Sequence, residues 1–109
     1  MVRIDFSIFY VGGSYGHANG DVDIAIPSGP GASIDLSEVA VDAPPAGFSG
    51  QLVVDSVLAV DGIGNLYACG DVCVASKAEA KALGRWLDDL PGLSVWPNDL
   101  DDPLYHGSK

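Results

Sequence analysis

The chain has 109 residues, of which 48% are hydrophobic and 18% are charged. This length fits one domain with one core, and this balance excludes both a disordered chain and a membrane-spanning one. Fifteen acidic residues against five basic ones give a formal net charge of −10, and a field of that sign repels phosphates and argues against nucleic-acid or ATP binding.

The N-terminal half predicts a hairpin followed by a long loop. Every second residue from Val2 to Tyr10 is apolar or aromatic, and this alternation indicates a strand over residues 2–11. The glycine-rich segment 12–20 ends in Asn-Gly, a strong turn signal, and residues 21–26 alternate again, so we expect a second strand there. Residues 27–50 are rich in proline and glycine and predict a loop with at most one short strand or turn near residues 34–41.

A second hairpin is predicted to contain both cysteines. The valine-rich segments 51–61 and 66–75 are joined across residues 62–65. Cys69 and Cys73 would lie on one face of the second strand, about 13 Å apart, which is too far for a disulfide. We expect two buried, reduced thiols, and neither a metal site nor a cofactor, because the chain has only two histidines to complete a zinc site.

The C-terminal part predicts one helix and a final strand. Ser76 and Glu79 match the capping box that begins a helix. Apolar residues then recur at helical spacing as far as about Asp89, which gives the helix one apolar stripe to lay on a sheet. Residues 93–96 predict a short strand that Pro97 ends.

These elements predict an α+β domain over residues 1–97. Its antiparallel sheet has about four to five strands, built from two hairpins, with one main C-terminal helix packed on one face. Trp86 and Trp96 are expected between the helix and the sheet, and Trp96 is alternatively a candidate aromatic anchor for an interface. Residues 98–109 predict an acidic, mobile tail. The N-terminus lacks the apolar segment of a secretory signal, so we expect a cytoplasmic protein.

One local pattern offers an enzymatic alternative. Residues 11–14, Val-Gly-Gly-Ser, followed by residues 21–24, Asp-Val-Asp-Ile, resemble the nucleotidyltransferase signature, in which a Gly-Ser turn and a later Asp-x-Asp hold a metal-bound triphosphate. The resemblance implies that Gly13 and Ser14 contact phosphate and that Asp21 and Asp23 bind magnesium. Only six residues separate the two halves, where that family has a longer and usually helical segment, and no Lys or Arg occurs between residues 4 and 76. A degenerate nucleotidyltransferase-like enzyme is thus an alternative.

The sequence contains no complete catalytic motif. Ser14 and His17 are near each other in sequence, but nothing marks an oxyanion hole beside them, and no phosphate-binding loop is present. Small acidic α+β proteins without such motifs are often inhibitors. We therefore expect a non-enzymatic immunity or antitoxin-type protein that neutralises a basic toxin, a nuclease, by occluding its nucleic-acid-binding or active site. A phage-type inhibitor of a host nucleic-acid machine, an anti-CRISPR-like nucleic-acid mimic, is an alternative with the same physics.

The expected partner is a basic protein, such as a toxin or nuclease domain, rather than a nucleic acid or a membrane. The chain is expected to be a monomer alone or a heterodimer with its target. Carboxylates would stand where nucleic-acid phosphates sit in the target, and an aromatic side chain would anchor the contact. The predicted partner-binding surface is formed by Asp21 and Asp23 with the acidic segment that contains Asp35, Glu38 and Asp42, or alternatively by Asp99, Asp101 and Asp102 of the tail. Tyr15 is predicted to bind the partner as an aromatic anchor.

Overall fold

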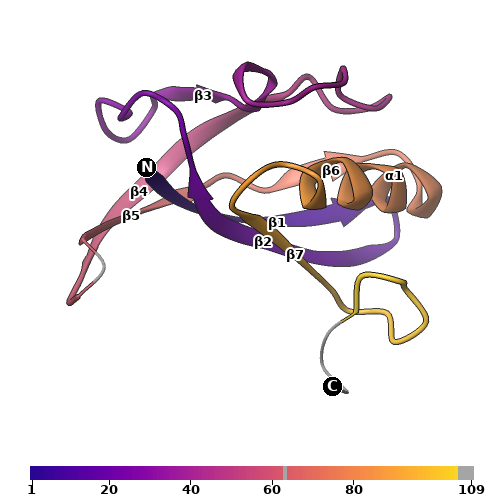
Figure 1. The fold of residues 1–109 in the computed structure, drawn as a ribbon. Helices are drawn as coiled ribbons and strands as arrows, with labels where there is room; N and C mark the ends of the chain where they lie inside the picture. Colours follow the sequence, from indigo (N-terminus) through magenta and orange to yellow (C-terminus); the bar gives the residue numbers. More distant parts are fainter. Residues whose placement is uncertain (63, 106–109) are drawn as a thin grey trace.

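The computed structural model describes residues 1–62 and 64–105, and Figure 1 shows their arrangement. In this part of the chain, one α-helix packs on a mixed sheet of seven strands, which confirms the α+β class. The elements in chain order are β1 (Val2–Tyr10), β2 (Gly13–Val22), β3 (Ser33–Asp35), the 3₁₀ helix η1 (Leu36–Glu38), β4 (Gln51–Val60), β5 (Gly64–Cys69), β6 (Val72–Val74), α1 (Lys77–Asp88) and β7 (Leu93–Pro97).

The strands follow the order β3-β4-β5-β1-β2-β7, and β6 also pairs with β1. The pairs β1–β2 and β4–β5 are antiparallel, but β5 and β6 both run parallel to β1. The prediction of a purely antiparallel sheet of about four to five strands is therefore wrong. Alternation along a strand shows which of its faces is buried and carries no information about its neighbours, so the parallel pairing has no local signal in the sequence.

The strand predicted at 66–75 is split in two by Gly70 and Asp71. β5 pairs with the first part of β1 and β6 pairs with its last part, so the two short strands share one edge of β1. The break disturbs the alternation of faces. Cys69 is buried and Cys73 is exposed, and both are free, so the expectation of two buried thiols is correct for Cys69 and wrong for Cys73.

The glycine-rich segment predicted as a loop forms most of β2. The turn after β1 is at Val11 and Gly12, and the second strand ends at Val22, so the strand predicted at 21–26 is wrong beyond that residue. Two of these glycines instead allow β7 and the turn before it to approach β2 closely. A Cβ on Gly16 would collide with the backbone of Trp96 and Pro97, and one on Gly20 with the backbone carbonyl of Gly92. Glycine at these positions lets β7 lie against β2.

A β-bulge turns Tyr15 into the core. The β1–β2 register shifts between Ile8, which pairs with Gly16, and Phe9, which pairs with Ser14, and this leaves Tyr15 as the extra residue. Its side chain is buried, and a Cβ on Gly84 of α1 would collide with its hydroxyl. A glycine in the helix therefore leaves the space that the tyrosine occupies.

The helix confirms the predicted cap and apolar stripe. The Ser76 hydroxyl accepts a hydrogen bond from the Glu79 N–H at 3.2 Å, and the Glu79 carboxylate accepts one from the Ala75 N–H at 3.0 Å. Both bonds satisfy donors at the start of the helix that have no partner within it. Leu83 and Leu87 of α1 are fully buried and belong to the same core as the inward-facing residues of β1. Within the described chain, no helix is long and apolar enough to cross a membrane.

The long segment between β2 and β4 lies on the same side of the sheet as α1 (Figure 1). It contains one short strand, β3, followed by η1, within the region predicted to hold a short strand or turn. Trp86 of α1 donates its indole N–H to the Asp42 carbonyl at 3.1 Å and packs edge-on against Phe48, with ring centroids 5.8 Å apart. Trp86 thus joins the helix to this segment.

The segment after β7 contacts the body of the protein as far as Leu104, which packs against the core. The Asn98 N–H donates to the Tyr15 carbonyl at 2.8 Å, and Lys77 forms an ion pair with Asp99 at 3.3 Å. The Tyr15 hydroxyl donates to the Asp102 carboxylate at 3.0 Å in a buried contact. The last residues of the predicted tail, 106–109, lie outside the described residues.

Candidate functional site

The face of the sheet opposite α1 gathers polar, aromatic and aliphatic side chains from five strands. In Figure 1 the helix and the segment 23–50 lie on one side of β1 and β2, and this face is the other side of the sheet. Strand register fixes its membership, because residues directly opposite one another point to the same face. We call this surface the open face, and its central residues are Arg3, Asp5 and Ser7 of β1, His17, Asn19 and Asp21 of β2, Leu66 of β5, Leu58 and Val60 of β4, and Ser94 and Trp96 of β7.

An exposed aromatic pair lies at the β7 side of the open face. Trp96 and His17 are directly opposite in the β2–β7 register, and their rings stack with centroids 6.3 Å apart and planes 14° from parallel. Trp96 is 40% exposed, so the prediction that it packs between helix and sheet is wrong. Successive side chains of a strand point to opposite faces of the sheet. Because β7 buries Leu93 and Val95, the side chain of residue 96 must point outward.

Arg3 and Asp21 form a bidentate pair at the N-terminal end of β1. The Arg3 Nε and Nη2 atoms donate to the two carboxylate oxygens of Asp21 at 3.0 and 2.8 Å. The hydrogen bonds from Arg3 hold the pKa of Asp21 below its usual value. Asp21 is therefore largely compensated by Arg3, and the nearby Asp5 carries the uncompensated charge.

Asp5 borders a hollow in the open face. Its side chain is half-buried, and among the described residues it has neither a hydrogen-bond partner nor an ion-pair partner. The hollow has a volume of about 220 Å³ and is lined by Arg3, Asp5, Asn19, Gly20, Val60 and Leu66. It therefore combines one free carboxylate and one amide with two aliphatic side chains.

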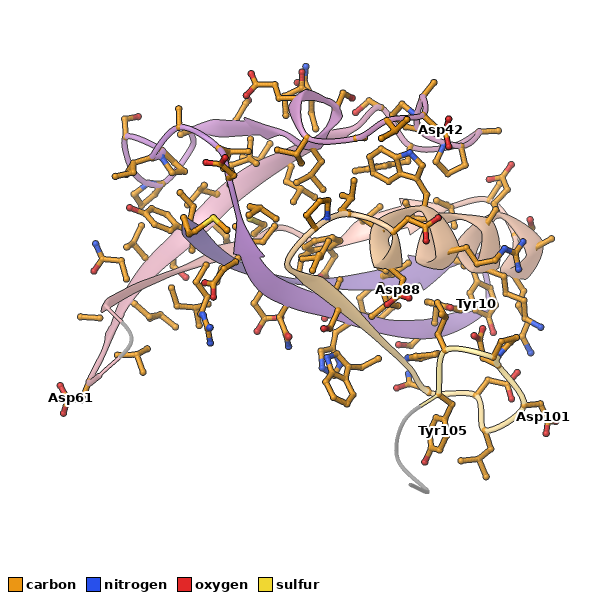
Figure 2. All side chains as sticks on the ribbon, viewed as in Figure 1. Tyr10, Asp42, Asp61, Asp88, Asp101 and Tyr105 are labelled. Atoms are coloured by element: carbon orange, nitrogen blue, oxygen red, sulfur yellow. The ribbon has the colours of Figure 1, made fainter. Side chains whose placement is uncertain are left out.

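The acidic residues predicted to bind a partner do not form one surface. Asp21 is on the open face and Asp23 is exposed just beyond the end of β2. Asp35, Glu38 and Asp42 lie on the segment that contains β3 and η1, where the Asp35 carboxylate accepts from the Ser37 N–H at 3.0 Å. Asp99 and Asp101 follow β7, and Figure 2 shows Asp42 and Asp101 on opposite sides of α1.

Two of the predicted partner-binding residues are buried. Tyr15 is 3% exposed and Asp102 is 6% exposed, and their side chains bond to each other. Asp102 also accepts from the Leu104 N–H at 2.9 Å. This pair fastens the segment after β7 to the bulge in β2, and neither side chain offers a surface to a partner.

The two halves of the nucleotidyltransferase-like pattern are far apart in the structure. Ser14 lies at the start of β2 and Asp21 near its end, and seven residues of strand span about 23 Å. Phosphate contacts at Ser14 and metal ligands at Asp21 would therefore not meet on one triphosphate. Within residues 1–62 and 64–105, no group of three or more His, Cys, Asp or Glu side chains is placed to hold a metal ion.

Sequence reasoning selected Asp21 and considered Trp96 as an anchor, but it missed Arg3, Asp5, His17 and Asn19, which the open face brings together with them. The alternation in β1 already placed Arg3 and Asp5 opposite the core, which was a usable signal. His17 and Asn19 belong to a strand paired with β1, but the glycine-rich composition of β2 indicated a loop there instead.

Comparisons with protein-family models, curated proteins and solved structures found no match.

Two buried groups, the Cys69 thiol and the Tyr15 hydroxyl, predict a loss of stability at alkaline pH. Burial raises the pKa of Cys69 to about 11, and burial together with the bond to Asp102 raises the pKa of Tyr15. The unfolded chain releases these protons near their ordinary pKa values of 9 and 10. Above these values the folded state holds more protons than the unfolded state. The contribution of the two groups to the free energy of unfolding is therefore fully present below about pH 9 and decreases as the pH rises.

Urea unfolding at a series of pH values measures this loss. Tyr15→Phe and Cys69→Ala should each make the fall in the unfolding free energy above pH 9 less steep, although each lowers stability at neutral pH. Cys73→Ala, which removes the exposed thiol, is the matched control and should leave the slope as it is in the unmodified protein. An unchanged slope in both test variants would contradict the assignment.

Proposed function

We propose that the protein is a non-enzymatic, acidic binding protein that inhibits a basic protein partner. In this proposal it is an immunity or antitoxin-type inhibitor that neutralises a nuclease toxin by occluding its nucleic-acid-binding or active site. The observation that carries the proposal is the open face, where an exposed Trp96–His17 stack lies on the same surface as the free carboxylate of Asp5.

The aromatic stack suits the centre of a protein interface. Trp is among the residues that most often dominate binding energy, and it buries a large area at a small cost in conformational entropy. Trp96 is already held against His17, so its ring orientation is set before a partner arrives. Such preorganisation lowers the entropy lost on binding.

The distribution of charge suits a basic partner. In the described part of the chain, Arg3 is the only basic residue of the open face apart from His17, and Asp21 holds its guanidinium. Lys77, Lys81 and Arg85 belong to α1, which packs on the opposite face. The net charge of −10 would accelerate association with a cationic surface and would repel phosphates from the same face.

Capture of the partner tests this proposal. The tagged protein is co-expressed with its own genomic neighbours and isolated at low and then at high salt, and mass spectrometry identifies what remains bound. A stoichiometric basic protein that is retained at low salt and released at high salt is the expected result. If only the protein itself is recovered at low salt, the inhibitor proposal fails.

The same face would serve the phage-type alternative, in which the target is a host nucleic-acid machine. The identity of the captured protein separates the two proposals. A nuclease encoded beside the gene supports immunity, and a subunit of a defence complex supports the alternative.

A further inference from the structure

We infer that the hollow beside Asp5 receives a lysine or arginine side chain of the basic partner. This inference rests on the proposed function and adds the contact point and the chemistry of the group that enters it. It starts from the arrangement of three adjacent strands. Asp5 of β1 is directly opposite Asn19 of β2, which is directly opposite Ser94 of β7, so these polar side chains form one row across the open face.

The lining of the hollow matches a long cationic side chain. Val60 and Leu66 offer aliphatic surface to the methylene stem, while Asp5 and Asn19 offer oxygen acceptors to the charged end. A charge-assisted hydrogen bond to a carboxylate is about twice as strong as a neutral one. The hollow therefore has a suitable partner for each end of a lysine or arginine side chain.

The local charges favour a cation over an anion. Arg3 also lines the hollow, but two of its nitrogens, Nε and Nη2, donate to Asp21. The charge left without a partner is the half-buried carboxylate of Asp5. An incoming cation would give this carboxylate an ion-pair partner and a charge-assisted hydrogen bond.

The size of the hollow points to a single side chain. Its volume of about 220 Å³ lies below the range of about 300–1,000 Å³ that is usual for drug-sized ligands. The Trp96–His17 stack is two residues along and up to two strands across from Asp5, which is roughly 12 Å at ordinary strand spacings. One face of a partner helix or hairpin could reach both features at once.

A small cationic probe tests the hollow without the partner. The ¹⁵N-labelled full chain is titrated with N-acetyl-arginine-methylamide, and the amide shifts are followed by NMR. Saturable shifts are expected at Asp5, Asn19, Gly20 and Leu66. In Asp5→Asn, which keeps the side-chain shape, the concentration for half-saturation should rise at least tenfold, whereas Asp23→Asn, at an exposed carboxylate off the hollow, should leave it unchanged.

The results separate this inference from the proposed function. Shifts that are spread over the exposed carboxylates, or that are equal in Asp5→Asn and the unmodified protein, overturn the hollow as a cation site, even if a basic partner is captured. Shifts that depend on Asp5 establish the cation site, and a failure to capture any basic partner would then count against the inhibitor proposal alone. The remaining amide signals of Asp5→Asn report whether the variant is folded.

Discussion

Replacing Gly20 with alanine is expected to lower the free energy of unfolding by about 3 kcal/mol or more. Gly20 has a φ of +149°, and an added Cβ would collide with the backbone carbonyl of Gly92 and approach the Cα of Leu93 to 2.9 Å. Because those are backbone atoms, no rotamer change relieves the contact. β7 would have to move away from β2, and the stack of Trp96 on His17 would be lost with it.

Urea unfolding of Gly20→Ala and Gly12→Ala gives the comparison. Gly12 also has a positive φ, of +101°, but nothing lies within 4 Å of the position of its Cβ. Its alanine variant therefore carries the conformational cost alone, about 1–2 kcal/mol. If Gly20→Ala lost no more stability than Gly12→Ala, close packing of β7 on β2 would not be what the glycine provides.

Replacing Trp96 with alanine is expected to weaken binding of the captured partner by about 30-fold or more, which corresponds to about 2 kcal/mol. Trp96 is an exposed ring at the edge strand, so its removal should change the stability of the isolated protein far less than it changes affinity. Most of the loss should appear as faster dissociation, because the anchor acts after the two charged surfaces have met.

Surface plasmon resonance with the partner immobilised measures both rates. Val41→Ala is the matched control, because Val41 is a fully exposed apolar residue on the segment between β3 and β4. It should bind like the unmodified protein. Equal losses in the two variants would show that the open face has no special role.

Local sequence signals predicted the elements whose form is set by their own residues. The Ser76 cap, the apolar stripe of α1, β1 and the final strand were recovered because each is a property of one segment. The glycines of β2 were interpreted as a turn because their reason lies in β7, more than 70 residues away in the pairing of Gly16 with Pro97. The parallel placement of β5 and β6 beside β1 also depends on distant contacts.

The candidate site was harder to predict than the fold. Charge counting found the acidic character but selected Asp102, and the search for an aromatic anchor selected Tyr15. The bulge and the segment after β7 bury these two side chains against each other. Charge counting passed over Asp5 as a site residue. Asp5 is notable only because Asn19, Val60 and Leu66 surround it in the folded sheet. A site assembled from five strands cannot be identified until their order is known.

The central claim is that the open face contacts a basic partner, and the most direct test is a chemical-shift map of the complex. The ¹⁵N-labelled protein is titrated with the unlabelled captured partner. The largest shifts should fall on His17, Asn19 and Trp96, with the Trp96 indole signal among them, while Trp86 stays unchanged. Shifts confined to residues 35–42 or 98–102, with the open face unaffected, would contradict the claim.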